Sequence, residues 1–451
     1  MASNDSGSQR GSSPTKRAKS TLPPEKVFSI QIGTELFRLS GASIASDAPS
    51  YFSQFFEEQL RQNGENANIR TLYIDRDPET FREIARHLQG YHVEPKDESQ
   101  FVKLFADAQF YTLPRLISQL FESQIFIQIG ERHFQISRDI FSGPGDSPNF
   151  FSLGFAIFFA NPSEIFPGLD RHGLLRPPAI VPPRVTHRSG DVFAQLLHLL
   201  RGYPLQIRNE EHRAELLRDC RYFHLRGLEQ KLIPHHISFN PIPQRSEIVI
   251  RLDDVRPSGI RHARDDNSKH TGSPTRDRVT YARPFVDETP HDLILEIGDE
   301  STILNARTMR AGFLNLAKAR MASLAQVIAK KLDLEGGGSL YRTGEPAHPS
   351  TGGDSFSIRF EPETELILNG QAVDYLDFPG GTAESSERPP AKRKRVEEEL
   401  ESGCLVVRNG QWRLVVDSGP AASAELVLIA VKLDVYTEER MRNRSRGFLG
   451  S

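Results

Sequence analysis

Three charged residues, Asp75, Arg76 and Asp77, stand directly before an apolar helical stripe and are the first candidates for specific chemistry. Two carboxylates beside a guanidinium can form charge-assisted hydrogen bonds with another protein. Asp77 can equally be the N-cap of the helix that follows, because Pro78 suits the first helical position and Glu79 lies near the positive helix end. Capping requires neither Asp75 nor Arg76, so a partner contact stays open for both.

The patterns of common catalytic and metal sites are missing from the sequence. It contains no phosphate loop ending in G-K-S or G-K-T, no H-E-x-x-H, no G-x-S-x-G and no paired C-x-x-C. The adjacent pair His235 and His236 is more typical of solvated side chains than of metal ligands. Cys220 and Cys404 lie far apart in apolar segments, where we expect buried thiols. We predict a protein that is not an enzyme and that has no metal site and no cofactor.

Length and charge narrow the class of protein further. At roughly 150 residues per domain, 451 residues predict about three domains. The net charge of −3 argues against nucleic-acid binding by the chain as a whole, and two cysteines favour a reducing compartment. The N-terminus has no apolar signal segment, and the most apolar stretch, residues 150–162, is shorter than the roughly 20 residues of a membrane-spanning helix. We expect the protein in the nucleus, the cytoplasm or both, without a membrane partner.

The most informative pattern is an internal repeat. Four segments recur in the same order, and each second copy lies 97 to 112 residues further along the chain. The pairs are 28–40 with 125–137, 47–52 with 146–151, 73–91 with 186–203, and 107–120 with 219–232. Because four collinear matches are hard to obtain by chance, we infer that a whole domain recurs. The Pro-rich segment 166–185 is the insertion that lengthens the second copy.

Each repeated segment has a physical interpretation. Residues 28–32 alternate like a half-buried strand, and Gly33 makes the turn into a second strand. The helix after Asp77 has its apolar stripe from Phe81 to Leu88 and a glycine exit at Gly90. The second copy keeps this design with other residues. They are the cap Ser189, the acidic Asp191, the stripe Phe193, Leu196 and Leu200, and the exit Gly202.

These segments make residues 27–121 similar to a BTB/POZ domain of the potassium-channel tetramerisation type, and residues 125–236 resemble a second, diverged copy. The resemblance rests on "IQIGTELFRLS", "DAPSYF", "IDRDPETFREIARHLQGY" and "ADAQFYTLPRLISQL". It implies small α/β domains that self-associate or bind partners, with the Asp-Arg-Asp-Pro segment near the associating surface. Of that segment the second copy keeps Arg188. The candidate protein-binding residues are therefore Asp75, Arg76, Asp77 and Arg188.

The rest of the chain is predicted to be a charged linker and a β-rich α+β domain. Two Asn-Gly pairs, Asn369-Gly370 and Asn409-Gly410, predict type I′ hairpins, and Trp412 is expected in the core. The predicted fold class is thus α+β or α/β, with two tandem BTB/POZ domains before the C-terminal domain. The predicted parts are a disordered basic tail (1–24), the first BTB/POZ domain (25–123), the second (124–238), a linker (239–281) and the C-terminal domain (282–440) with a disordered basic insertion (379–403).

The insertion contains the strongest basic run, Lys392, Arg393, Lys394 and Arg395. An extended, proline-flanked run of this kind suits a nuclear import receptor, and it is equally compatible with a solvated charge run. Direct binding to nucleic acid is less favoured, because a glutamate run follows immediately.

Taken together, these features predict a non-enzymatic protein that forms homo-oligomers and acts as a scaffold or as a substrate adaptor of a cullin ubiquitin ligase. The cullin partner and an unknown client protein follow only from the resemblance. A nuclear regulatory protein associated with transcription is one alternative, and a purely structural oligomer is another.

Overall fold

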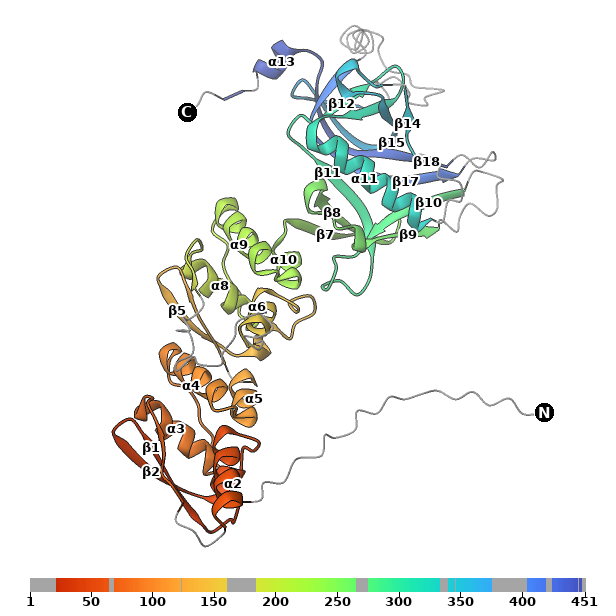
Figure 1. The fold of residues 1–451 in the computed structure, drawn as a ribbon. Coiled ribbons are helices and arrows are strands. Elements are labelled where there is room, and N and C mark those ends of the chain that lie inside the picture. Colours follow the sequence, from red (N-terminus) through yellow and green to blue (C-terminus); the bar gives the residue numbers. More distant parts are fainter. Residues whose placement is uncertain are drawn as a thin grey trace, which may run out of the picture. The chain divides into compact units, whose positions relative to one another are not determined.

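The computed structural model describes residues 22–64, 69–122, 124–159, 184–264, 275–332, 340–344, 346–374, 404–418, 424–444 and 446–447. The chain forms two compact units that divide between Leu225 and Arg226 (Figure 1). Unit one contains the strands of both repeat copies. Unit two begins at Arg226, whereas the sequence predicts that the second copy extends to residue 238.

The first half of unit one is a three-stranded sheet with helices on one face. Strand β1 alternates buried and outward residues, pairs antiparallel with β2 and parallel with β3, and gives the order β2-β1-β3. Gly33 turns the chain between β1 and β2 with a φ of +54°, a conformation that favours glycine. The elements are β1 (Val27–Ile32), β2 (Glu35–Ser40), α1 (Gly41–Ala45), α2 (Tyr51–Asn63), β3 (Leu72–Ile74), α3 (Pro78–Leu88), α4 (Glu98–Phe110) and α5 (Pro114–Glu122).

Aromatic rings form the core of this half. The ring of Phe81 on α3 contacts three others at centroid distances of 4.8 to 5.7 Å: Phe37, Phe52 and Tyr111. Rings of this size bury more apolar surface than any other side chain, so they dominate the stability of the core. The predicted stripe from Phe81 to Leu88 is buried, as its helical spacing indicates.

The second half of unit one repeats this arrangement. Strand β4 pairs antiparallel with β5 and parallel with β6, which gives the order β5-β4-β6. Phe193 takes the place of Phe81 and contacts three rings at 4.9 to 5.3 Å: Phe134, Phe151 and Phe223. The elements are β4 (Ile125–Ile129), β5 (Arg132–Ile136), the 3₁₀ helix η1 (Arg138–Phe141), α6 (Phe150–Phe159), β6 (Arg184–Val185), α8 (Gly190–Leu200) and α9 (Glu210–Phe223).

Unit two is built on one large sheet. Its main path runs β12-β13-β15-β18-β17-β10-β11-β8-β7. Because β12 pairs with both β13 and β17, the strands β12, β13, β15, β18 and β17 close into a ring. The strands are β7 (His235–Asn240), β8 (Arg245–Arg251), β9 (Ile260–Arg264), β10 (Thr275–Tyr281), β11 (His291–Ile297), β12 (Thr302–Asn305), β13 (Arg310–Phe313), β14 (Arg342–Thr343), β15 (Asp354–Leu368), β16 (Gln371–Val373), β17 (Cys404–Ser418) and β18 (Ala424–Tyr436).

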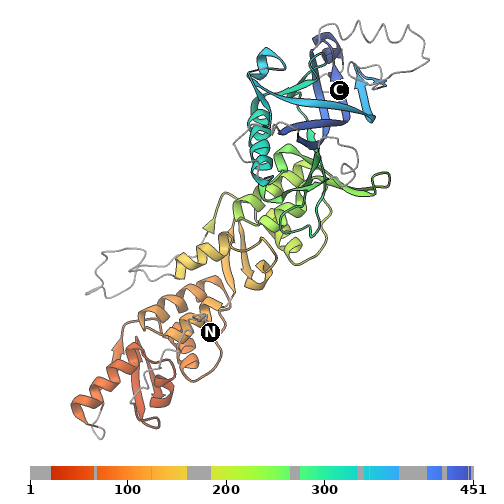
Figure 2. The same ribbon diagram turned by 90° about the vertical axis from the view of Figure 1, so that its right-hand side faces the viewer.

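Helix α11 (Asn315–Lys331) lies along one side of this sheet (Figures 1 and 2). It buries Met321, Leu324 and Ile328 on the side that faces the strands. Trp412 on β17 is fully buried, which confirms its predicted place in the core. The remaining elements are α10 (Arg226–Leu232), the 3₁₀ helices η2 (Leu252–Asp254), η3 (Pro257–Gly259) and η5 (Pro349–Thr351), and α13 (Glu439–Arg444).

The predicted linker over residues 239–281 is wrong for the part of it that the structure describes. Strands β8, β9 and β10 occupy most of it and are integral to the sheet. The error has a physical cause. Strands β9 and β10 carry five charged residues between them, three of them consecutive at 276–278, so their few buried residues, such as Ile260, Val279 and Tyr281, do not form an apolar run.

The two Asn-Gly pairs behave differently. Asn369 and Gly370 have φ values of +53° and +82° and join β15 to β16, so this hairpin is confirmed. The hairpin predicted at Asn409-Gly410 is wrong, because β17 continues through this pair between β11 and β18, with a shift of its register against β18 on either side of the pair. The glycine makes room for the neighbouring indole instead. A Cβ at Gly410 would lie 2.6 Å from Nε1 of Trp412.

Helices long and apolar enough to cross a bilayer do not occur among the described residues.

Candidate functional site

Asp77 is the N-cap of α3, as one of its two predicted roles requires. Its carboxylate accepts hydrogen bonds from the Glu79 amide (3.2 Å) and the Thr80 hydroxyl (2.7 Å). Partial burial alone would raise the pKa of Asp77, but these bonds and the Lys103 ammonium outweigh it and lower the pKa. Asp77 is thus ionised and held by its own helix. Asp75, one residue beyond β3, is exposed.

Arg76 points into unit one. Its guanidinium is paired with Asp107 on α4 and lies 4.0 Å from the ring centroid of Phe110. Burial raises the pKa of Asp107 to about 6, and the Arg76 charge only partly opposes that shift. The pair therefore fastens the segment between β3 and α3 to helix α4. Arg76 thus has a structural role within the domain that requires no contact with another protein.

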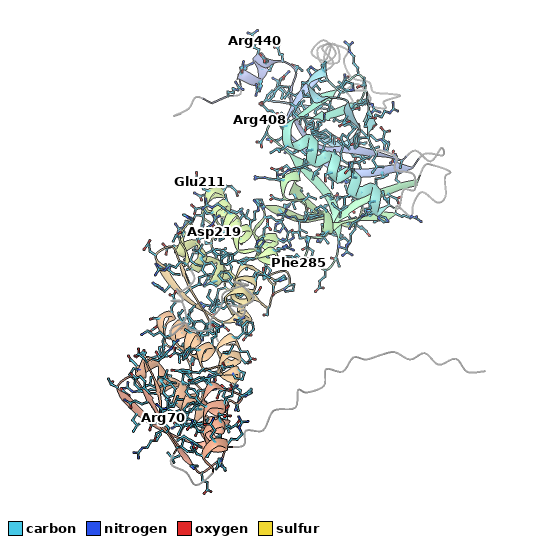
Figure 3. All side chains as sticks on the ribbon, viewed as in Figure 1. Arg70, Glu211, Asp219, Phe285, Arg408 and Arg440 are labelled. Carbon is cyan, nitrogen blue, oxygen red and sulfur yellow. The ribbon has the colours of Figure 1, made fainter. Side chains whose placement is uncertain are left out.

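The second half contains the same arrangement. Arg188 Nη1 donates to Asp219 on α9 (3.2 Å), the residue labelled in Figure 3. The Arg188 guanidinium lies 4.3 Å from the Tyr222 ring centroid. Burial raises the pKa of Asp219, and Arg188 again opposes it. The arginine, the aspartate and the aromatic residue are all 112 positions beyond their counterparts. Sequence reasoning missed this trio, although Asp107 and Asp219 open the two matching segments 107–120 and 219–232.

The two halves of unit one meet through the sheet of the second and the helices of the first. Phe126 on β4 packs on Phe101 of α4 with ring centroids 5.3 Å apart, and both side chains are buried. His133 on β5 donates to Glu98 at the start of α4 (2.8 Å). The outward face of β4 and β5 is thus an internal contact.

The equivalent face of the first half is open. Gln31 on β1 lies between Leu36 of β2 and Tyr73 of β3, so these three side chains form one row across the sheet. Leu36 is 53% exposed and Tyr73 is 60% exposed. Arg38, two residues from Leu36 and on the same face, is exposed as well. We call Gln31, Leu36, Arg38 and Tyr73 the outer patch.

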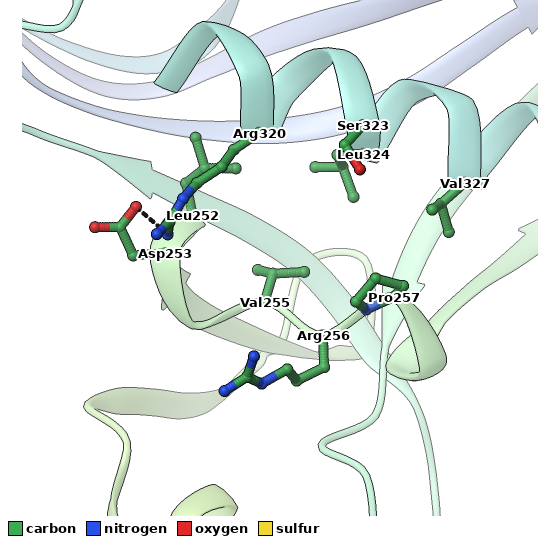
Figure 4. A pocket seen from close by; sticks show the side chains of 9 residues that line it. All are labelled: Leu252, Asp253, Val255, Arg256, Pro257, Arg320, Ser323, Leu324 and Val327. Carbon is green, nitrogen blue, oxygen red and sulfur yellow. Dashed lines mark hydrogen bonds and ion pairs between the residues drawn. The ribbon is translucent and has the colours of Figure 1, made fainter. Parts of the chain in front are cut away.

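A second candidate is a cavity of about 230 Å³ in unit two, between α11 and the segment from η2 to η3 (Figure 4). Its walls are mainly apolar, and its charged groups are already paired. Arg320 bonds Asp253, and Arg256 Nη2 donates to Glu229 (2.6 Å). No cation is left for an anionic ligand at this cavity among the residues that line it. The outer patch is therefore the stronger candidate.

Two further predicted features are the basic run and the histidine pair. Lys392, Arg393, Lys394 and Arg395 lie outside the described residues. His235 is held by the Ile233 carbonyl (2.7 Å) and by Arg283 (2.6 Å). Among the described residues, no three histidine, cysteine or acidic side chains come close enough to hold a metal ion.

Comparison with known proteins assigns the first half to a family. Residues 28–121 match the family model described as BTB/POZ domain, so they form a BTB/POZ domain of the potassium-channel tetramerisation type. BTB/POZ domains are protein-interaction modules and not enzymes. The match defines the outer patch as a surface of an interaction domain. The family match ends at residue 121, ahead of the second half.

Two proteins of the yeast Saccharomyces cerevisiae are similar to this chain beyond that domain. One, an uncharacterized protein called YDR132C, is 37% identical over 331 residues, which are 63% of this chain and 66% of the relative. The other, the BTB/POZ domain-containing protein YLR108C, is 37% identical over 263 residues, or 57% of this chain and 52% of the relative. The chain thus spans about two thirds and about half of these relatives, and each match is longer than the BTB/POZ domain.

Proposed function

We propose that the protein is a non-enzymatic scaffold that self-associates through the outer patch of its BTB/POZ domain. One observation carries the proposal. The same face of the sheet is covered in the second half by α4 and left open in the first, where Leu36 and Tyr73 are exposed. Exposed apolar side chains on an open sheet face are typical of a surface that another protein covers.

The second half is, on this proposal, a diverged BTB/POZ copy. Its support is the matching strand order, the matching ring cluster around Phe193 and the matching arginine–aspartate pair. Arg213 stands on α9 where α4 has Phe101, and Ser29 stands on β1 where β4 has Phe126. The contact between the halves depends on the ring pair of Phe126 and Phe101. The equivalent positions on β1 of one chain and α9 of a second chain carry no rings, so a second chain cannot form the same contact.

A second copy of the outer patch is the partner that suits it best. Arg38 lies on β2 at one side of the Leu36–Tyr73 row, and Asp75 follows Tyr73 on the other side. In a two-fold contact these opposite charges approach each other across the interface, which is how an isologous interface becomes self-complementary. Asp75 then has the partner role proposed for it. Arg76 and Asp77 hold the segment that follows β3 in place, and Arg188 has the role of Arg76 in the second half.

The test is the mass of the full chain by light scattering after size exclusion. We expect a multimer for the natural chain and a monomer for Leu36→Glu combined with Tyr73→Glu. The matched control is Tyr203→Glu, which changes a similarly exposed tyrosine in the second half. Asp75→Arg should weaken the multimer, and adding Arg38→Asp should restore it. A natural chain that is monomeric, or a multimer indifferent to these changes, would contradict the proposal.

A more specific version makes the scaffold a substrate adaptor of a cullin ubiquitin ligase. Its support is the BTB/POZ domain alone. The test adds a cullin amino-terminal domain to the full chain and measures the mass again. A gain in mass supports the adaptor. No gain favours an oligomer with a structural role and another, still unidentified client.

The alternative function is nuclear regulation, which the basic run Lys392–Arg395 favours. Deleting residues 389–396 from a fluorescent fusion should move the protein from the nucleus to the cytoplasm. Unchanged localisation would remove this run as an import signal. Replacing the first basic cluster, residues 14–19, is the control for a second signal.

A further inference from the structure

The cavity between α11 and the segment from η2 to η3 is bounded by fixed elements on both sides (Figure 4). Two bonds tie α11 to this segment. Arg320 bonds Asp253 of η2, and Lys331 Nζ donates to the carbonyl of Ile260, the residue that follows η3 (2.7 Å). Arg320 and Lys331 are about three helical turns apart. The helix is therefore held at both ends of the cavity.

The wall opposite the helix is fixed as well. The chain between the 3₁₀ helices η2 and η3 is extended. The Arg256 amide donates to the Tyr281 hydroxyl (3.1 Å), and the Arg256 guanidinium donates to Glu229 (2.6 Å). Gly259 lies so close to the end of β10 that a Cβ there would be 2.3 Å from a backbone carbonyl oxygen. Because these contacts hold the segment in place, it cannot close on α11, and the cavity is preformed.

The volume of the cavity determines the size of molecule that it can hold. The cavity measures about 230 Å³. An apolar cavity of about 150 Å³ holds benzene, which has six heavy atoms, so by proportion this one holds about nine or ten. A stable protein interface uses about 20 to 30 residues on each side, whereas nine residues line this cavity. A small bicyclic molecule is therefore the occupant that fits.

The lining residues determine the chemical class of this molecule. Most of them are apolar, namely Leu252, Val255, Pro257, Leu324 and Val327. Both arginines of the lining are paired with carboxylates. A charged ligand would lose its hydration at this cavity without gaining an unpaired opposite charge, which costs free energy. The cavity thus favours a neutral and mainly apolar molecule.

Two polar groups on α11 can orient such a molecule. Arg320 bonds Asp253 through Nη1, and its other guanidinium nitrogens have no partner among the described residues. Ser323 is exposed and lies three positions further along, on the same side of the helix (Figure 4). Both side chains can donate a hydrogen bond to the ligand. A ligand with a carbonyl oxygen is therefore favoured over a hydrocarbon of the same size.

We propose that this cavity binds a neutral bicyclic molecule of about nine or ten heavy atoms that carries a carbonyl group. The carbonyl oxygen accepts from Arg320 and Ser323, and the rings contact Leu324 and Val327 on one side and Val255 on the other. The bound molecule joins α11 to the segment between η2 and η3. The site lies in unit two and does not depend on the BTB/POZ outer patch.

Ligand-detected NMR on the full-length chain tests the proposal with four probes that share one bicyclic frame: indanone, indane, aminoindane and indane carboxylate. We expect indanone to bind with a dissociation constant of about 1 mM or below. Indane lacks the acceptor and should bind about threefold to tenfold more weakly. The cationic aminoindane and the anionic carboxylate should give no signal. Absence of a signal from indanone at millimolar concentration, or equally tight binding of a charged probe, would overturn the proposal.

Matched variants locate the binding. Val327→Phe places a ring in the cavity and should weaken the binding of indanone about tenfold or more. Gln326→Phe adds the same ring at an exposed position of α11 outside the lining, and it should bind indanone like the natural chain. Arg320→Met should remove the preference for indanone over indane. Unchanged binding by Val327→Phe would place the probe elsewhere and contradict the proposal.

Hydrogen exchange of the natural chain makes the test independent of whether the variants fold. Indanone should slow the exchange of amides in residues 320–327 of α11 and in residues 252–257, because the ligand contacts both walls of the cavity. Aminoindane should leave the exchange of both segments unchanged. Slower exchange with indanone that is confined to other segments would overturn the assignment of this cavity.

Discussion

The two halves of unit one have the same sheet and core, and they differ in whether the outward face of the sheet is covered. Both have a three-stranded sheet, a four-ring core and an arginine–aspartate pair under an aromatic ring. In the second half the outward sheet face carries Phe126 and is buried on α4, whereas in the first it carries Leu36 and Tyr73 and is open. The outward face of the sheet is thus an internal contact in one half and an open surface in the other.

A further difference lies behind the sheets. Asp47 is buried and accepts hydrogen bonds from His87 (2.9 Å) and from the amides of Arg115 (2.7 Å) and Leu116 (3.0 Å). The residue 112 positions beyond His87 is Leu199, which has no hydrogen-bonding side chain. The first half therefore orients the start of α5 with a polar network that the second half does not reproduce in this form.

The largest expected effect concerns the contact between the halves. Phe101→Ala should lower the free energy of unfolding by about 3–5 kcal/mol, the range for removing a buried ring from a core. Arg213→Ala, the equivalent change on α9, should cost less than about 0.5 kcal/mol. Denaturant unfolding of the two variants measures both values. Equal effects would mean that the two helices are used alike and that the comparison is mistaken.

The next effect distinguishes the two arginine–aspartate pairs. Arg76→Met leaves Asp107 buried without its cation, and we expect a loss of about 3 kcal/mol in unfolding free energy. Arg188→Met should cost less, about 2 kcal/mol, because Arg188 is the more exposed arginine and its bond is an ordinary 3.2 Å. Unfolding curves again give the values. A variant of Arg76 that stays as stable as the natural chain but loses its multimer would assign this residue to the interface instead.

The pH dependence of stability should reflect Asp107. Its folded pKa of about 6 lies above the unfolded value near 4, so the folded state binds the extra proton between these pH values. The stabilisation that it contributes is full below about pH 4 and is lost as the pH rises through about 6, with a total of about 3 kcal/mol. Asp107→Asn should remove that fall. The measurement is the difference in unfolding free energy between the natural chain and the variant from pH 4 to 7. A difference that does not vary with pH would show that Asp107 is ionised throughout.

The smallest effects belong to the two sheet faces themselves. His133→Ala removes a partly exposed pair with Glu98 and should cost about 0–1 kcal/mol. Leu36→Ala should change the unfolding free energy of the monomer by less than about 0.5 kcal/mol, since Leu36 is exposed. Thermal melts at low protein concentration measure both. A large loss for Leu36→Ala would mean that this side chain supports the domain rather than an interface.

Much of unit one could be predicted from the sequence, because its signals are local. The Asp77 cap, the stripe from Phe81 and the turn at Gly33 each depend on a few neighbouring residues. The role of Arg76 could not be predicted, because its partner Asp107 is 31 residues away. An arginine in a sequence does not reveal whether its side chain faces solvent or a buried carboxylate. The available signal was that the arginine, the aspartate and the aromatic residue each recur 112 positions further along the chain, which indicates that they belong together.

Unit two was harder to predict for the same reason. Its sheet joins segments far apart in sequence, such as Arg413 with Glu247 (2.8 Å), and ion pairs on one face hide the alternation of strands. Asn409-Gly410 has the residue types of a hairpin, yet partners on both sides keep β17 continuous, with a register shift against β18 on either side of the pair. The outer patch was not predicted as a surface at all, since Leu36 and Tyr73 become neighbours only through the pairing of β1 with β2 and β3.

The closed ring of unit two has a consequence for how the protein is made. Strand β17 pairs with β10, β11, β12 and β18, and β18 is the last strand of the sheet in chain order. A ribosome must therefore translate residues through Tyr436 before the ring can close, although earlier pairs such as β8 with β11 are already available, whereas unit one has all its strands by Val185. Unit one can thus fold on a nascent chain while the ring of unit two still lacks its last strand.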